Sequence, residues 1–432
     1  MKCFSKISAV LLAVSFIIVF SACSKAEPEY SFPSVSDINE ANIDASFVAE
    51  ITSIQAETFD GEKVNDTSKP FYSYLPEGSV DYCSEAIITH AESGKDYRLL
   101  NFGKRVYEND VKVYKGKLPS SNTIIPYSLT SDGKYTSLTF QTDFKAPFTF
   151  ELKTQEYFDI ESGDFKIENP TFSYIEITFF YCTNLVDDFD FSNNRLISGY
   201  EIVQNSNNAV LKLFLRNEGA FYGWYADYNN EDMLVIKLLE PTKVYTADNE
   251  YGYALHDATI VVDAGHGGED PGAMNGRHKE SAFNLGLATK LKEELEKIGV
   301  TVVMTRATNK NVDAANRLET AYLSEADMII SVHRDSGSEN GFNAFYFSPY
   351  SYNAAKALTD STNNANLYST VHKQAWHYFF LNRVSSCPAI LTENGFITNE
   401  NDLKNMLDNE YETRCAKALT AGIIEFYISA PF

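Results

Sequence analysis

The pattern of apolar and polar residues divides the chain near residue 250. Before that point, short runs rich in Tyr, Phe, Thr, Val and Ile are separated by Gly, Asn, Asp and Pro, which is typical of β-strands joined by turns. The clearest runs are 97–102, 111–114, 136–140, 148–152, 174–180, 210–215 and 234–238. The pattern predicts an all-β, sandwich-like region of antiparallel strands over residues 37–250. The part around residues 75–82 either forms a separate small subdomain or belongs to the same sandwich.

After Ala258, strand-like runs alternate with helical periodicity. Leu287, Leu291 and Leu295 recur at helical spacing, and Gly299 is placed to end that helix. Further helices are expected around 314–324, near 354 and over 410–427, and strands at 260–263, 300–304, 328–332 and 389–392. This alternation predicts an α/β domain over residues 256–430, built on an open, mostly parallel sheet with helices on both faces.

Four polar residues stand at the ends of these predicted elements. They are His266 in a glycine-rich turn after the strand 260–263, Glu280 at a helix start, His333 after the strand 328–332 and Glu393 after the strand 389–392. Each alone has an ordinary explanation, such as a turn histidine, an acid at a helix N-terminus or a surface acid. Because ligands of open α/β sheets bind outside the carboxyl ends of the strands, the four residues are expected at one rim. Such a set fits a catalytic zinc site, with three ligands, one open position for water and one carboxylate for proton transfer.

The motifs follow one another in a recognisable order. They are 263–268 (DAGHGG), 270–273 (DPGA), 279–280 (KE), 284–285 (NL), 305–306 (TR), 316–318 (NRL), 326–327 (AD), 331–333 (SVH), 388–396 (PAILTENGF) and Asn399. Over roughly residues 259–427 this order resembles the type-3 zinc N-acetylmuramoyl-L-alanine amidases. The resemblance implies that His266, Glu280 and His333 bind one Zn²⁺ per chain and that Glu393 is catalytic.

The reaction that the resemblance implies is cleavage of peptidoglycan at the amide between N-acetylmuramic acid and the L-alanine of the stem peptide. The residues themselves support only zinc-dependent hydrolysis of an amide-like bond, with Glu393 as general base and then general acid. Two other classes stay open: a wall-binding or regulatory protein with a degenerate amidase domain, and a different zinc hydrolase such as a peptidase or deacetylase. Muropeptide preference and protein regulators are not indicated.

Two arginines are further candidates for substrate binding or orientation. Arg334 follows His333 where the family commonly has a small residue, so it either reads an acidic group of the stem peptide or narrows the cleft. Arg383, shortly before the strand of Glu393, either orients the base or a substrate carboxylate, or is an ordinary surface residue.

The first residues predict export. Lys2 and Lys6 precede an apolar stretch over residues 7–20, which is too short for a comfortable membrane span. Ser21-Ala22-Cys23 resembles a bacterial lipoprotein signal, which implies a signal peptide over residues 1–22, lipidation and membrane anchoring through Cys23, and a location in the cell envelope outside the cytoplasm. The Phe at position 20 departs from that pattern, and a plain secretory peptide remains the alternative. Residues 23–36 are expected to form a flexible tether.

Composition restricts the partners. With 36 basic and 59 acidic residues, the net charge of -23 argues against nucleic acid, but not against peptidoglycan. The cysteines of the mature chain after Cys23 show no Cys-x-x-Cys spacing, which argues against a cysteine metal site, and no disulfide is assigned among them: Cys83, Cys182, Cys387 and Cys415. Residues 137–240 have a weak likeness to the AMIN-type β modules that accompany cell-wall amidases.

Overall fold

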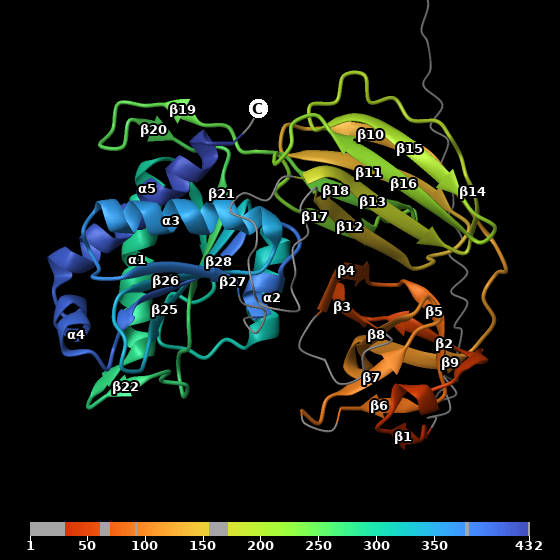
Figure 1. Cartoon of the computed structure of the whole chain (residues 1–432), viewed down its shortest axis with the longest axis horizontal. Helices are drawn as coiled ribbons and strands as arrows, with labels where there is room; N and C mark the ends of the chain where they lie inside the picture. Colours follow the sequence, from red (N-terminus) through yellow and green to blue (C-terminus); the bar gives the residue numbers. More distant parts are fainter. Residues whose placement is uncertain (1–30, 61–69, 91–92, 155–171, 376–379, 431–432) are drawn as a thin grey trace, which may run out of the picture. The chain divides into compact units, whose positions relative to one another are not determined.

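The computed structural model describes residues 31–60, 70–90, 93–154, 172–375 and 380–430 (Figure 1). The expected signal peptide, the lipidation site Cys23 and most of the expected tether lie outside the described residues. At the end of the expected tether, β1 (Ser34–Val35) pairs in parallel with β6 (Ile87–Thr89), so these two residues belong to a sheet. Within the described part of the chain, no helix is both long and apolar enough to cross a membrane.

The C-terminal domain contains a six-stranded mixed sheet. Its strand order is β24 (Thr301–Met304), β21 (Thr259–Ala264), β25 (Met328–Asp335), β28 (Ala389–Phe396), β26 (Phe342–Tyr346) and β27 (Val371–Ala375). The first four strands are parallel, as the sequence predicts, but β26 runs antiparallel to β28, and β27 is parallel to β26. The reversal follows from the short connection 336–341, because a parallel strand would need a crossover of about a dozen residues or more.

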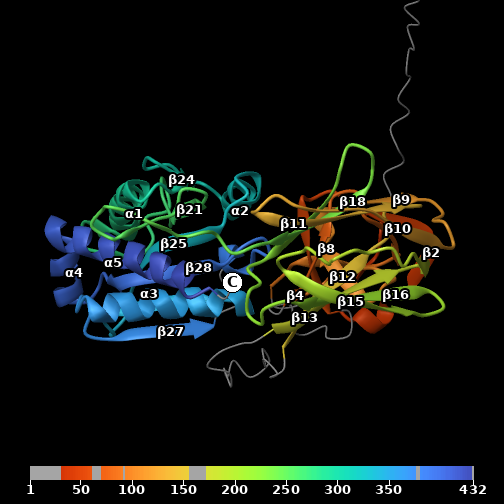
Figure 2. The ribbon, with the colours of Figure 1, turned by 90° about the horizontal axis from the view of Figure 1, so that it is seen from above.

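Helices cover both faces of this sheet. The helix α3 (Tyr352–Asn364) packs on α5 (Asn409–Ile428), and α5 packs on α1 (Glu280–Lys297), so the three form one layer. The helix α2 (Ala314–Leu323) lies on the opposite side of the sheet from α1, as Figures 1 and 2 show. The short α4 (Glu400–Met406) packs against α5 and β28.

The apolar spacing of α1 explains its placement. Leu287, Leu291 and Leu295 lie on one side of the helix and are fully buried, together with the strand residues of β21. The chain then turns at Gly299, whose φ of 85° is readily adopted by glycine. The helix therefore begins at the site residue Glu280 and ends at the opposite edge of the domain.

In its described residues, the region before residue 250 consists mainly of β-strands, which form four larger sheets. The first comprises β1, β6, β7 (Asp96–Leu99), β8 (Lys104–Tyr107), β3 (Gln55–Asp60) and β4 (Pro70–Pro76). The second comprises β5 (Val80–Ser84), β2 (Ile43–Ile51) and β9 (Val111–Lys115). The third comprises β14 (Cys182–Leu185), β10 (Asn122–Ser131), β11 (Tyr135–Thr142), β18 (Leu234–Leu239) and β17 (Trp224–Tyr228). The fourth comprises β12 (Phe148–Thr154), β13 (Phe172–Phe180), β16 (Asn208–Leu215) and β15 (Ile197–Gln204).

The third and fourth of these sheets share one apolar core. Phe140 and Trp224 of the one sheet and Phe150, Ile177 and Leu211 of the other belong to a single buried cluster. Their strands alternate buried and partly exposed positions, because successive side chains of a strand point to opposite faces. These two sheets have the sandwich-like arrangement that the alternating pattern predicts.

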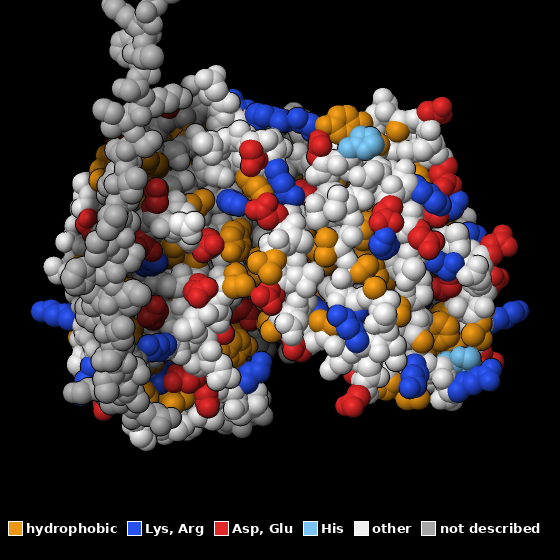
Figure 3. All heavy atoms as spheres, turned by 180° about the vertical axis from the view of Figure 1, so that it is seen from behind, with side chains coloured by type: hydrophobic (Ala, Val, Ile, Leu, Met, Phe, Trp, Pro, Cys, Tyr) orange, Lys and Arg blue, Asp and Glu red, His pale blue; other side chains and the backbone are white. Residues whose placement is uncertain are grey.

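The described cysteines are free, buried thiols: Cys83, Cys182, Cys387 and Cys415. Burial raises the thiol pKa to about 12 for Cys83, Cys387 and Cys415 and to about 11 for Cys182. On the face shown in Figure 3, acidic and basic side chains are interspersed, and they do not gather into one basic surface.

The buried stripe of α1 can be tested with a pair of leucines. Leu291 is 0% exposed on α1, whereas Leu323, at the end of α2, is 71% exposed. We expect Leu291→Ala to lower the free energy of unfolding by about 2–5 kcal/mol. The matched Leu323→Ala should change it by less than about 0.5 kcal/mol. Urea unfolding followed by circular dichroism measures both; equal losses would contradict the assignment of the core.

Candidate active site

The turn after β21 carries His266 in a strained backbone conformation. His266 has a φ of 59°, and the next residue, Gly267, has a φ of 132°. A Cβ on Gly267 would lie 2.3 Å from the carbonyl oxygen of Lys310, so only glycine fits there. The glycines of the DAGHGG motif therefore allow the backbone at Lys310 to approach the turn closely, and this holds His266 at the end of the strand.

Two buried arginines fix this turn through its carbonyl groups. Arg306 donates to the oxygens of Ala264 at 2.7 Å and of Gly265 at 2.8 Å. Arg317 donates to the carbonyl oxygens of Ala264 and His266, each at 2.9 Å. The positions of both arginines were part of the sequence resemblance, but the motif gave no indication of this role.

The carboxylate of Asp263, at the start of the DAGHGG motif, also binds Arg317. It accepts hydrogen bonds from Thr305 and Ser331, both at 2.5 Å, and pairs with Arg317. Burial raises the pKa of Asp263, but the charge of Arg317 and these hydroxyl groups outweigh burial and lower it. An ionised Asp263 therefore ties β21 and β25 to α2.

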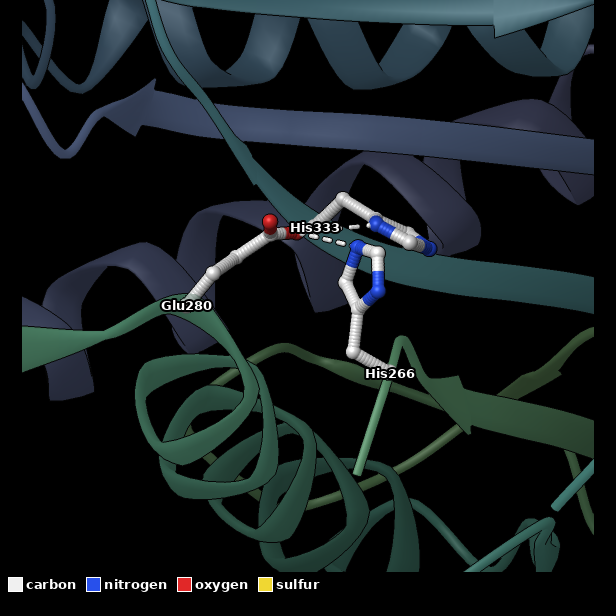
Figure 4. Close-up of side chains that lie close together, drawn as sticks. All are labelled: His266, Glu280 and His333. Atoms are coloured by element: carbon white, nitrogen blue, oxygen red, sulfur yellow. Dashed lines mark hydrogen bonds and ion pairs between the residues drawn. The ribbon is translucent and has the colours of Figure 1, made fainter. Parts of the chain in front are cut away.

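Three of the predicted site residues converge on one point. Glu280 Oε1 lies 3.2 Å from His266 Nε2 and 3.0 Å from His333 Nδ1 (Figure 4). One candidate ligand atom from each residue falls within 4.8 Å of the other two. Two imidazole nitrogens and a carboxylate oxygen at this spacing could hold a metal ion.

Hydrogen bonds orient these ligand groups. Asp270 Oδ2 lies 2.7 Å from His266 Nδ1, which leaves Nε2 of the same ring facing Glu280. Glu280 accepts from the Ala273 amide at 2.8 Å and from Asn284 Nδ2 at 3.1 Å. Asp270 belongs to the DPGA motif, but its contact with His266 could not be predicted from the motif, because the contact depends on how the turn folds.

Glu280 and its neighbours shift the pKa values of His266 and Glu280 in opposite directions. Hydrogen bonds with Glu280, and next with Asp270, raise the pKa of His266 to about 9 against the effect of burial. Burial raises the pKa of Glu280, but hydrogen bonds from His266 and His333 reverse this and hold it far below its usual range. A metal ion binding here would displace the proton of His266.

Glu393 lies beside this cluster on the next strand. Glu393 is the register partner of His333 between the parallel strands β28 and β25, so the two side chains share one face of the sheet. Glu393 is 8% exposed, and its Oε2 has no hydrogen-bond partner among the described residues. Burial, followed by the charges of Glu280 and Asp335, raises its pKa well above the usual range, although Arg334 opposes this.

Both strands extend further than the sequence indicates. The predicted strands end before His333 and before Glu393, whereas β25 continues to Asp335 and β28 to Phe396. Asn394 and Gly395 are typical turn residues, yet both lie inside β28, where Gly395 adopts a φ of 96°. Glu393 is aimed by strand pairing and not by a turn.

A cleft of about 350 Å³ opens next to the histidines. Its lining includes His266, His333, the segment 311–314, and Phe380 and Leu381 of the 3-10 helix η4 (Phe380–Arg383). Glu280 and Glu393 are more deeply buried and do not line it. A substrate in the cleft would reach the two imidazoles first.

The residues of this cluster lie in a segment that matches a known protein family. Residues 260–425 match the family model described as N-acetylmuramoyl-L-alanine amidase. These residues form an amidase domain of that family. They contain all four candidate residues and the arginines that hold the turn.

The amidase domain accounts for the similarity to individual relatives. N-acetylmuramoyl-L-alanine amidase LytC of Bacillus subtilis is 29% identical over 175 residues, which are 39% of this chain and 35% of LytC. The probable cell wall amidase LytH of Staphylococcus aureus is 32% identical over 182 residues, which are 41% of this chain and 60% of LytH. The chain thus spans less than two thirds of either relative. The catalytic domain of CwlV from Bacillus (Paenibacillus) polymyxa var. colistinus is 26% identical, with a TM-score of 0.38, over 40% of this chain and 99% of that one.

The expectation that Arg334 faces the cleft is wrong. Arg334 is 1% exposed and donates to Glu412 Oε2 of α5 at 2.6 Å and to the carbonyl oxygen of Asn394. Successive residues of a strand point to opposite faces, so His333 at the cleft requires Arg334 to point toward the helical layer. Arg334 therefore links the strand of His333 to the strand of Glu393.

Arg383 is not an ordinary surface residue of the amidase domain. Its side chain is 12% exposed and forms an ion pair with the carboxylate of Glu57 on β3. This partner lies far away in the sequence and could not be predicted from the motif.

Two glycines near the site of the amidase domain allow a matched test. A Cβ on Gly272 would lie 2.4 Å from Glu280 Oε2, whereas nothing lies within 4 Å of one on Gly276. Both residues have positive φ, 64° and 58°, so the backbone strain of an alanine is similar. If His266, Glu280 and His333 hold Zn²⁺, Gly272→Ala should weaken its binding roughly 10–100-fold, as is typical when groups around metal ligands are disturbed. Gly276→Ala should bind normally; competition with a chromophoric chelator measures both, and equal affinities would contradict the ligand role of Glu280.

Proposed function

We propose that the protein is a zinc-dependent peptidoglycan hydrolase that cleaves the amide between N-acetylmuramic acid and the L-alanine of the stem peptide. One observation carries the proposal: in a domain of the amidase family, the ligand atoms of His266, Glu280 and His333 converge beside the unpartnered carboxyl oxygen of Glu393. All four residues expected for catalysis are present, which argues against a degenerate domain.

The three converging residues fit zinc in their chemistry. Zn²⁺ in catalytic sites takes three nitrogen or oxygen ligands from the protein and keeps one position open. His266 Nε2, His333 Nδ1 and Glu280 Oε1 supply such donors, and Asp270 fixes the orientation of the first ring. Bound zinc lowers the pKa of water and polarises a carbonyl group placed against it.

Glu393 would move the protons of the reaction. Its raised pKa suits a group that takes a proton from the attacking water and returns it to the leaving amine nitrogen. The hydrogen bond that Arg334 donates to the carbonyl oxygen of Asn394 holds the strand at this point. The unpaired Oε2 leaves Glu393 free to accept a proton, because no other described side chain competes for it.

The same proposal extends to the location of the protein. Cell-wall amidases among the relatives support a place in the cell envelope outside the cytoplasm. Anchoring through a lipid on Cys23 rests on the sequence pattern of residues 1–23 alone. Metabolic labelling with a palmitate analogue tests this part: the label should be incorporated by the natural chain and not by Cys23→Ala.

A digest of purified peptidoglycan tests the reaction. We expect release of intact stem peptide with a free L-alanine amine, and we expect a chelator to abolish it and added Zn²⁺ to restore it. Mass spectrometry of the products identifies the bond. Shortened peptides would indicate a peptidase, deacetylated sugars would indicate a deacetylase, and no product would leave a binding protein; each of these outcomes would refute the proposed reaction.

The role of Glu393 can be separated from metal binding. Glu393→Gln keeps the size of the side chain but removes the base, so zinc should stay bound while turnover falls by a factor of about 100 to 10,000. Glu400→Gln is a matched control, because Glu400 is an exposed acid shortly after Glu393 in the chain. Stem-peptide release and zinc content are measured on the same samples. Near-normal turnover would refute the base role, and loss of zinc would make Glu393 a ligand.

A further inference from the structure

The 3-10 helix η4 carries two residues of the cleft wall, Phe380 and Leu381, and contacts the N-terminal β region through Arg383. These two residues line the cleft and belong to η4, which ends at Arg383. The Arg383 guanidinium lies 5.2 Å from the centre of the Phe380 ring, in a cation–π contact. The position of Arg383 is therefore coupled to the position of a residue that a substrate would touch.

Glu57 holds Arg383 in a two-point ion pair. Arg383 Nε donates to Glu57 Oε1 at 2.7 Å, and Nη2 donates to Oε2 at 3.0 Å. The side chain of Glu57 is 7% exposed and that of Arg383 is 12% exposed, so solvent is mostly excluded from the pair. A bidentate arginine–carboxylate pair fixes direction as well as distance, because both groups are planar.

Other contacts from the β region hold the same segment. The hydroxyl of Tyr74 on β4 donates to the carbonyl oxygen of Arg383. The Trp224 amide on β17 donates to the carbonyl oxygen of Ser385 at 2.7 Å. These contacts lie within residues 33–432, which form one compact unit. Strands from two different sheets of the β region thus contact the segment that joins the cleft wall to β28.

The Glu57–Arg383 pair is better explained by a role in positioning η4 than by a contribution to the stability of the fold. Burial raises the pKa of Glu57 even though the charge of Arg383 lowers it, so desolvation outweighs the attraction. A buried ion pair often adds little net stability and in some proteins serves to select one geometry. That geometry here is the position of η4 against the cleft.

We propose that Glu57 is a positioning residue of the amidase: through Arg383 it holds the Phe380–Leu381 wall where the muropeptide binds. The β region then determines substrate affinity, although every residue proposed for the chemistry lies after Ala258. This inference rests on the proposed function for the identity of the substrate.

The test uses point variants of the full chain. In Glu57→Gln and Arg383→Gln, we expect KM for a soluble muropeptide to rise about tenfold with kcat within about twofold, because binding is lost and the reacting groups are untouched. The double variant should be no worse than either single variant, since both remove one interaction. Tyr74→Phe, which removes only the hydroxyl donor, gives a second and milder test if a charge variant folds poorly.

A second ion pair provides the control. Lys237 Nζ lies 2.7 Å from Glu325 Oε1 and joins β18 to the turn after α2, and among the described residues neither side chain forms a hydrogen bond or ion pair with η4. Glu325→Gln should leave both KM and kcat unchanged. An unchanged KM in folded Glu57→Gln, a loss confined to kcat, or a gain in activity would overturn the proposal.

Two further measurements separate this proposal from the proposed function. Hydrogen exchange of the amides over residues 380–387 needs no substrate and should become faster in Glu57→Gln at unchanged zinc affinity. Titration of muropeptide into Glu393→Gln, with and without Glu57→Gln, should show the same tenfold loss of affinity. A natural chain that releases no stem peptide refutes the proposed function, whereas unchanged exchange refutes the hold of Glu57 on the wall.

Discussion

The active site depends on the register of three parallel strands. Strand pairing sets Asp263 opposite Ser331 and His333 opposite Glu393, so the side chains of three strands reach one rim at fixed spacing. A shift of one residue in β28 would turn Glu393 to the other face of the sheet. The buried carboxylate of Asp263 secures this register, because it bonds to Ser331 of the neighbouring strand and to Arg317 of α2.

The same fold gives two carboxyl groups opposite properties. Glu280 and Glu393 are both buried and close enough to influence each other. Glu280 faces two imidazoles and a backbone amide and stays ionised, whereas Glu393 has no donor on one oxygen and holds a proton more readily. Pairs of acids whose surroundings separate their pKa values divide the work of a site between a charged group and a proton carrier.

Much of the site could be predicted from the sequence, because its residues lie in short motifs at the ends of periodic segments. His266, Glu280 and His333 were placed together on this basis, and the structure brings their ligand atoms to one point. The ends of β25 and β28 were predicted too early, since turn-forming residues such as Asn394 and Gly395 are accommodated by pairing with neighbouring strands. Arg334 points away from the cleft for the same reason, because β25 continues through this residue. The partner of Arg383 could not be predicted at all, because Glu57 belongs to another part of the chain and no local pattern connects them.

The buried cysteines bear on how such a protein can be made. Cys83 and Cys182 lie in the β region and Cys387 and Cys415 in the amidase domain, and all four thiols are unpaired and shielded from solvent. Thiols with a raised pKa are poor nucleophiles, so oxidants and mixed disulfides have little access to them once the chain is folded. The described fold therefore contains no covalent crosslink whose formation must await an oxidising compartment. Within the described residues, noncovalent packing alone holds the fold together, so a reducing agent breaks no bond in it.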